Sequence, residues 1–221
     1  MFHPNDNPME RGWVGRVDGE RVLHLAAQTL QAFFLGGGGA REHAEYALAE
    51  VTLLTPVLQP PNVRLFESQD LFAFGNATAV TGPGSPAGAA GARLSLLPRV
   101  AAVIGAEGRI GGYTLLADWR AEGVPQPKDR DFALGLGPLV VTPDELDAAT
   151  VELSVAVDGD ERHRAPAPAF DWERARALAE AGTTLRPGDI LAGPPSGRLD
   201  RVEGLVELRG TGIGALGQAT A

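Results

Sequence analysis

The chain has 221 residues, a formal net charge of −9 and 44% hydrophobic residues, which suits one domain with a sizeable core. The acidic balance argues against a nucleic-acid surface, because neutralising phosphates requires clustered lysine and arginine. Cysteine is absent, which excludes disulfides, thiolate nucleophiles and cysteine-type zinc sites, and is typical of a reducing compartment.

Residues 1–11 are polar and lack the apolar core of a signal peptide. No apolar run approaches the roughly 20 residues that span a bilayer. We therefore expect a soluble cytoplasmic protein without a membrane partner. High alanine, glycine and arginine usage beside a single lysine is typical of a GC-rich bacterial genome.

The first 55 residues are predicted to form a small N-terminal region. An Asp-Gly turn between two short alternating runs predicts a β-hairpin at residues 14–25. Apolar residues at helical spacing predict a helix at 26–35, which ends at four glycines (36–39) whose role stays open. A second short helix is predicted at 41–50. The proline pair after it places the boundary at 55/56, with the main domain covering 56–221.

The main domain is predicted to consist mostly of strands. Strand-like segments lie at 62–66, 72–74, 100–104, 110–116, 139–141, 151–157 and 206–209. Residues 82–92 carry small side chains and predict a loop, a capping box at Thr142 predicts a short helical turn, and Asp171 caps a predicted helix at 172–181. Many strands, few helices and no βαβ repeat predict an α+β, mostly β fold.

The common sequence motifs for phosphate binding, metal binding and serine catalysis are not matched. The four glycines lack a following Lys-Ser/Thr, and the four histidines do not have metal-ligand spacing. Ser196 does not lie in a G-x-S-x-G pattern, so a serine triad has no support. From composition and spacing alone, the chain is a soluble α+β domain.

Seven segments in register resemble the fumarylacetoacetate hydrolase family. In chain order they are QPPNVRLF (59–66), GNA with GPG (75–84), VAAVIG (100–105), GYTLLADW (112–119), RDF with GPLVVTPDEL (130–146), LRPGDI (185–190) and VEL with GIGAL (206–216). GYTLLADW, which is similar to the family's G-Y-T-x-x-N-D-W, is the most distinctive. The resemblance implies a mixed β-sandwich-like roll, usually a dimer, and chemistry of aromatic catabolism.

The resemblance also implies a divalent cation, Mg²⁺ or Mn²⁺, at the mouth of the roll. Family members cleave or rearrange carbon–carbon bonds of oxo and dioxo acids. A 2-oxo acid chelates the cation, which stabilises the enolate formed as the bond breaks. Such an ion needs several hard oxygen ligands, and an E-x-E strand supplies two carboxylates to one face.

Most of these ligand positions are replaced in this chain. The aspartate of the family's R-D-F is Leu65, the two glutamates of E-x-E fall on Leu97 and Arg99, and only Asp118 retains a ligand position. The lysine of K-D-F is Arg130, whose guanidinium does not lose its proton near neutrality. Residues 71–106 contain no Asp or Glu, and residues 44–162 contain no His.

From these replacements we expect no cofactor and no catalytic residue, with Asp118 a vestigial ligand paired to Arg99. A relocated cation site remains an alternative. It would use the four carboxylates of Glu67, Asp70, Asp118 and Glu122.

Three functional hypotheses follow. In the first, a non-catalytic relative binds a small carboxylate, as a homodimer or as the partner of an active paralogue. Its anion-binding residues would be Arg64, Arg99, Arg120 and Arg130. In the second, the chain is still a hydrolase, decarboxylase or isomerase that acts on small oxo acids. In the third, the pocket is closed by Leu65, Leu97 and Phe72, and the chain is an interaction module.

Overall fold

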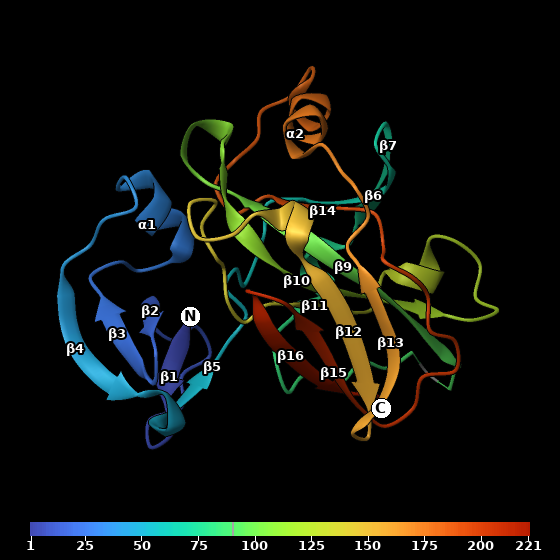
Figure 1. The fold of residues 1–221 in the computed structure, drawn as a ribbon, viewed down its shortest axis with the longest axis horizontal. Helices are drawn as coiled ribbons and strands as arrows, with labels where there is room; N and C mark the ends of the chain where they lie inside the picture. The colour runs from blue at the N-terminus through green and yellow to red at the C-terminus, as the bar shows by residue number, and fades with distance from the viewer. Residues whose placement is uncertain (90) are drawn as a thin grey trace.

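A computed structural model describes residues 1–89 and 91–221 of the chain. The fold is mostly β, as predicted, with strands that curl into a roll and two α-helices in the described part, α1 (Leu30–Leu35) and α2 (Trp172–Glu180) (Figure 1). No helix among the described residues is long and apolar enough to cross a membrane.

Two sheets build the main body. The seven-stranded sheet has the order β7 (Leu71–Gly75), β6 (Val63–Ser68), β14 (Ile190–Ala192), β9 (Leu94–Ile104), β10 (Ile110–Ala121), β11 (Leu134–Leu136) and β8 (Val80–Thr81). The four-stranded sheet has the order β13 (Asp160–Pro166), β12 (Glu152–Val157), β15 (Leu205–Gly210) and β16 (Gly214–Ala219).

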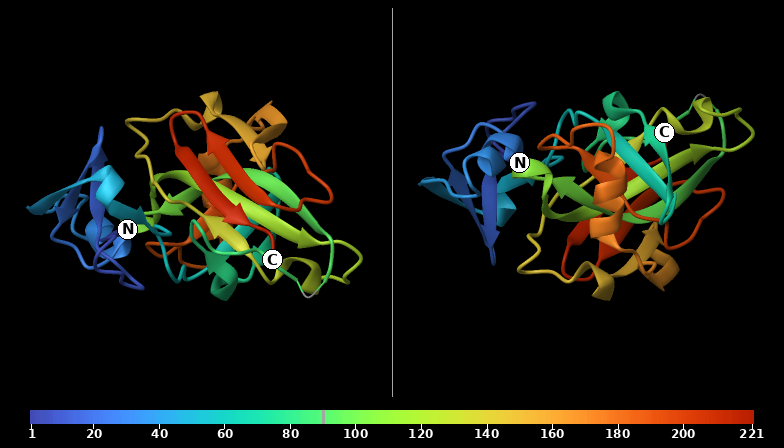
Figure 2. Two further views of the ribbon diagram at one scale, coloured as in Figure 1. Left: turned by 90° about the horizontal axis from the view of Figure 1, so that it is seen from below. Right: turned by 90° about the horizontal axis from the view of Figure 1, so that it is seen from above.

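The N-terminal strands form two smaller sheets at one end of the molecule, which both views of Figure 2 show beside the larger body. β1 (Phe2–Pro4) pairs with β5 (Val51–Leu53), and β2 (Gly15–Asp18) pairs with β3 (Arg21–Leu25), which pairs with β4 (Glu42–Ala47). Helix α1 joins this end to the main body, because Phe34 packs into a core cluster of the seven-stranded sheet.

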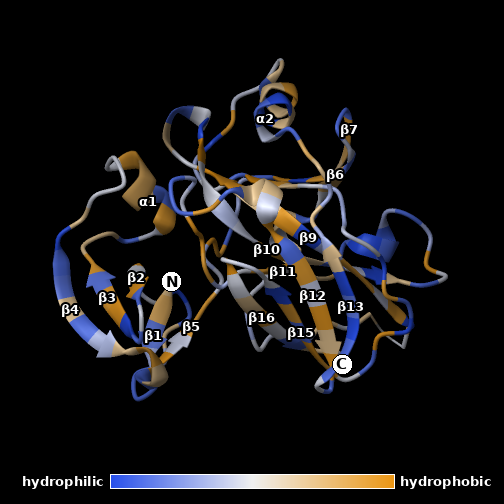
Figure 3. Ribbon diagram, in the orientation of Figure 1, coloured by the Kyte–Doolittle hydropathy of each residue, from blue (hydrophilic) through white to orange (hydrophobic). Residues whose placement is uncertain are grey.

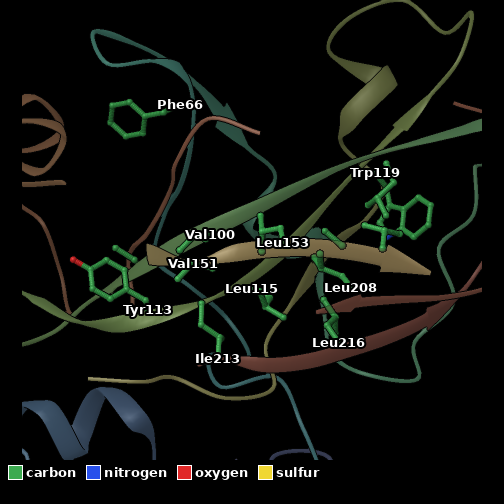
Figure 4. Close-up of a cluster of buried hydrophobic side chains, with 14 of the residues drawn as sticks. Phe66, Val100, Tyr113, Leu115, Trp119, Val151, Leu153, Leu208, Ile213 and Leu216 are labelled. Carbon is green, nitrogen blue, oxygen red and sulfur yellow. The ribbon is translucent and has the colours of Figure 1, made fainter. Parts of the chain in front are cut away.

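The longest strands, β9 and β10, separate two apolar clusters. Leu115 and Trp119 of β10 face the four-stranded sheet, where they pack with Leu153, Leu208 and Leu216 (Figure 4). Their neighbour along the strand, Leu116, faces the other side and packs in a second cluster. Since successive side chains of a strand alternate between faces, every second residue of β9 and β10 is directed away from the four-stranded sheet.

Two of the edge strands are polar. Figure 3 shows β4 and β13, each at the edge of its sheet, as largely hydrophilic. Charged edges of this kind discourage further strand pairing with other chains.

Several predicted elements differ from the structure. The second helix predicted at 41–50 is wrong: strand β4 occupies most of it and a 3₁₀ turn follows at Leu48–Glu50, because pairing with β3 outweighs local helix propensity. The strand predicted at 139–141 is reduced to a single bridge between Val141 and Tyr113. The capping box at Thr142 produces a hydrogen-bonded turn without a helix.

The hairpin predicted at 14–25 and the helix predicted at 172–181 are confirmed as β2–β3 and α2, whereas the first predicted helix is shortened to α1. Residue 90 of the predicted loop 82–92 lies outside the described residues. The domain boundary at 55/56 stays a prediction.

A substitution at Gly135 of β11 tests the packing between the central strands. A Cβ at Gly135 would lie 2.0 Å from Gln218 Oε1, and that oxygen accepts a hydrogen bond from the buried indole of Trp119 at 2.9 Å. Gly135→Ala therefore displaces a buried, hydrogen-bonded amide, and we expect a loss of about 1–3 kcal/mol in unfolding free energy. Urea denaturation measures it.

The control for this substitution is Gly217→Ala in β16, where a Cβ would meet nothing within 4 Å. It should leave the urea midpoint almost unchanged. Equal losses in both variants would contradict the packing described for Gln218.

Candidate functional site

The site begins with the pairing of β9 and β10. In their antiparallel register, Asp118 is opposite Leu97, and Leu116 is opposite Arg99. Alternation places Arg99 and Asp118 on the face that carries Leu116, away from the four-stranded sheet. Both side chains are fully buried.

Arg99 is bound through all three of its guanidinium nitrogens. Its Nε donates to Asp118 Oδ2 at 3.0 Å, and Nη2 lies 2.9 Å from the same oxygen. Its Nη1 donates to the backbone carbonyls of Phe66 at 2.6 Å and Gly193 at 3.0 Å. These contacts link β9 to β6, β10 and the segment after β14, so Arg99 works as a buried cross-link as well as a counter-charge.

A second guanidinium completes the coordination of Asp118. Arg120 Nε donates to Oδ1 at 2.7 Å and its Nη2 donates to Oδ2 at 2.7 Å, which is the strong bidentate geometry of arginine with a carboxylate. Burial works to lower the pKa of Arg120, but the hydrogen bond and charge of Asp118 outweigh it and hold that pKa above its ordinary value. Arg120 therefore stays cationic.

Three further side chains extend this centre toward the surface. Glu67 Oε1 lies 3.4 Å from Arg99, 3.5 Å from Arg120 and 3.7 Å from Arg130. Asp129 lies 3.8 Å from Arg120 Nη1 and 3.2 Å from Arg130 Nε. We call these six side chains the arginine–carboxylate network. It comprises Arg99, Arg120, Arg130, Glu67, Asp118 and Asp129.

Exposure increases outward through the carboxylates of the network. The side chain of Asp118 is 0% exposed, that of Asp129 is 15% exposed and that of Glu67 is 37% exposed. Glu67 is also the least tightly held, because each of its contacts exceeds the 2.7–2.9 Å that is typical of charge-assisted hydrogen bonds.

The structure brings together three of the four arginines predicted to bind an anion. Arg64 lies apart: it is on the face of β6 that carries Phe66, with its guanidinium 3.6 Å from Asp189 and above the ring of Phe74. Of the former ligand positions, Leu65 and Leu97 are both buried, which agrees with their apolar character.

The carboxylates of the alternative, relocated cation site are dispersed. Asp70 pairs with Arg174 on α2, and Glu122 accepts from Ser95. Glu67 joins Asp118 only through the arginines. Asp129 is a member of the network that sequence reasoning missed. The only signal for it was its position one residue before Arg130.

Comparison with known proteins identifies the family. The sequence profile described as Fumarylacetoacetate (FAA) hydrolase C-terminal matches residues 37–219. The chain therefore belongs to the fumarylacetoacetate hydrolase family, as the motifs indicate. No curated protein is close enough in sequence to count as a match.

Solved structures support the same fold over the whole chain. A maleylpyruvate hydrolase from Sphingobium sp. SYK-6 is 25% identical with a TM-score of 0.80, and the match covers 96% of this chain and 98% of that one. A 5-carboxymethyl-2-hydroxymuconate delta-isomerase from Mycobacterium smegmatis is 26% identical with a TM-score of 0.77, covering 100% and 97%. The fold thus occurs in both hydrolases and isomerases.

The expectation that no cofactor is involved needs correction. A second structure of the Sphingobium hydrolase, 24% identical with a TM-score of 0.78 over 96% of this chain and 97% of that one, contains manganese (II) and pyruvate. A neighbour with this fold therefore holds a divalent cation, and the differences expected at the ligand positions do not by themselves exclude one.

The residues around Asp118, as they stand, do not fit such a cation. Both oxygens of Asp118 already accept hydrogen bonds from guanidinium groups. In residues 1–89 and 91–221, no three His, Cys, Asp or Glu side chains are grouped as metal ligands. A hard dication requires several free oxygen donors, whereas this position presents two side-chain cations.

Removing Asp118 tests the buried centre. Asp118→Ala would leave Arg99 and Arg120 with uncompensated charge, and losing one partner of a buried ion pair costs about 3–5 kcal/mol. We expect a correspondingly lower urea midpoint. Arg99→Leu should cost less, because Asp118 keeps its two hydrogen bonds from Arg120.

The matched control is the exposed pair of Arg16 and Glu42, whose atoms approach to 2.6 Å with both side chains at least half exposed. Arg16→Gln should leave the midpoint unchanged, because exposed ion pairs contribute little. An Asp118→Ala midpoint equal to that of Arg16→Gln would contradict the buried network.

Proposed function

We propose that this chain is a non-catalytic member of the fumarylacetoacetate hydrolase family that binds a small carboxylate at Arg99, Arg120 and Arg130. The observation that supports it most is the position of Glu67. One of its two carboxylate oxygens, Oε1, lies between 3.4 and 3.7 Å from each of the three guanidinium groups. These distances leave room for a better-fitting anion.

The charge balance of the network favours a ligand with a single negative charge. The network contains three guanidinium groups and three carboxylates, so it is neutral with Glu67 in place. When Glu67 turns outward into solvent, three cations face only Asp118 and Asp129. A ligand carboxylate that replaces Glu67 restores neutrality and gains bidentate hydrogen bonds with arginine.

The backbone at Glu67 is suited to such an exchange. The pairing of β6 with β7 shifts register between Phe66 and Ser68, so Glu67 is the extra residue of a β-bulge. Bulges redirect a side chain without breaking the sheet. Glu67 is also partly exposed, whereas Arg99 beneath it is held by two backbone carbonyls. Arg99 is therefore fixed, while the competing carboxylate can move.

The kind of cation in the network supports the non-catalytic part of the proposal. The network's cations are arginines, which do not exchange protons near neutral pH. Sequence positions 44–162 contain no histidine, so a general base of that type is missing from the strands that build the site.

A second candidate is an active hydrolase, decarboxylase or isomerase of small oxo acids. The similarity to a hydrolase and an isomerase along nearly the whole chain favours it. It predicts Mg²⁺- or Mn²⁺-stimulated turnover of oxaloacetate or an acylpyruvate that is lost in Asp118→Ala. Such turnover would contradict the non-catalytic proposal.

Calorimetry with pyruvate tests the carboxylate site. We expect binding at millimolar concentration or below. Arg130→Gln should weaken the affinity about tenfold, which corresponds to about 1.4 kcal/mol. Glu67→Gln should strengthen it, because the competing charge is removed while the shape is kept.

Arg16→Gln, which changes an exposed arginine of the N-terminal end, is the charge-matched control and should bind like the wild type. The proposal fails if pyruvate and oxalate give no heat at millimolar concentration. It also fails if Arg130→Gln and Arg16→Gln bind equally well. Weaker binding in Glu67→Gln would show that Glu67 holds the ligand instead of competing with it.

A further inference from the structure

Two histidines approach one another on the three-stranded N-terminal sheet, outside the network. His24 is in β3 and His43 is in β4, and their ring centroids are 5.4 Å apart with 47° between the ring planes. The register of β3 with β4 shifts here, because His24 is opposite Ala44 while Leu25 is opposite Glu42. His43 is therefore the extra residue of a bulge.

The ring of His24 is fixed by its neighbours. Trp13 stacks on it with centroids 4.6 Å apart and planes 14° apart, and Phe2 packs edge-on at 6.1 Å. Phe2 is 1% exposed and belongs to the apolar cluster of this end. His24 is half-buried, whereas His43 is exposed. One imidazole is thus held rigidly, and the other adjoins it with access to solvent.

The spacing suits one cation between the rings. A nitrogen-bound zinc lies about 2.0–2.1 Å from its imidazole nitrogen, which puts it about 3.2 Å from each ring centre. At a tetrahedral angle, two such rings would have centres about 5.3 Å apart. The observed separation is 5.4 Å. Ring contact alone also gives separations of this size, as for Phe66 and Phe72 at 5.2 Å, so the distance permits such a bridge without requiring it.

We propose that His24 and His43 form a two-imidazole site for a borderline first-row divalent cation, Zn²⁺, Ni²⁺ or Cu²⁺, whose other positions are filled by water. Imidazole prefers these ions over the hard, oxygen-binding Mg²⁺ and Mn²⁺. The proposed site therefore selects a different class of metal ion from the Mg²⁺ or Mn²⁺ that the family resemblance implies.

The surroundings of His24 favour its neutral imidazole, which is the form that coordinates a metal. Burial, and then the charge of His43, lower the pKa of His24, which keeps more of it in the neutral form that coordinates a metal. The nearest carboxylates along β4 are already engaged: Glu42 pairs with Arg16 and Glu45 with Arg21. No third protein ligand joins the pair among the described residues, so the ion is held by two protein ligands only.

Trp13 provides the readout, because Cu²⁺ and Ni²⁺ quench the fluorescence of a nearby indole. Titrating the tag-free protein with CuCl₂ should quench the Trp13 emission in a saturable manner. Trp13→Phe should remove this change, while calorimetry still detects binding. Trp119 and Trp172 lie in the main body and should contribute little to the quenching.

His43→Gln should weaken the apparent affinity for Cu²⁺ at least tenfold. His43 is exposed, so this variant should fold normally, which a circular dichroism melt verifies. His24→Gln should have the same effect. The chain has four histidines, and all titrations use the His3→Gln background, because an N-terminal amine with histidine at position three itself binds Cu²⁺ and Ni²⁺. The matched control is His163→Gln in the main body, which should bind like that background.

The proposal is overturned if adding His43→Gln to the His3→Gln background leaves the affinity for Cu²⁺ unchanged, or if the control substitution His163→Gln weakens binding equally. It is also overturned if neither Zn²⁺, Ni²⁺ nor Cu²⁺ binds the wild-type protein at submillimolar concentration.

Discussion

The buried carboxylate of Asp118 is the interaction on which the site depends. It is shielded from solvent and shared by the guanidinium groups of Arg99 and Arg120. An ionised carboxylate is stable in such a place only when it is paired and hydrogen-bonded, and here both of its oxygens accept from arginine. Because Arg99 also binds carbonyls from two other segments, the same charge pair positions the surrounding backbone.

This arrangement separates the residues that hold the family fold from those that line the site. The sheet architecture depends on apolar alternation along β9 and β10, and the inward cluster around Trp119 is separate from the face that carries Asp118. Leu97 and Arg99 lie on that face, so changes at their positions leave the inward packing untouched. Fold and chemistry are therefore set by opposite faces of the same two strands, and one can change while the other is kept.

The sequence predicted the fold class, the hairpin and the longer helix, because strong local patterns and seven ordered motifs specify them. It failed where tertiary pairing decides: residues 41–50 are helical by composition, but become strand β4 through pairing with β3. For the site, the resemblance aligned Arg99 and Asp118 with ligand positions and led to the expectation that they pair, and the structure shows this contact. The sequence could not place Glu67 or Asp129, whose positions depend on a bulge and on a loop. Alternation along the strand at 62–66 does put Arg64 on the face opposite Leu65, which the anion-site prediction did not take into account. The cofactor expectation was wrong because it treated replaced ligands as proof of absence.

A double-mutant cycle between Arg99→Leu and Asp118→Leu tests the central claim most directly, since it isolates the coupling between the two side chains. If their ion pair organises the site, the free energies of unfolding should be strongly non-additive, with a coupling of about 2–3 kcal/mol and a double variant more stable than Asp118→Leu alone. Additive losses within about 0.5 kcal/mol would mean that Arg99 and Asp118 do not depend on one another, and would contradict the account.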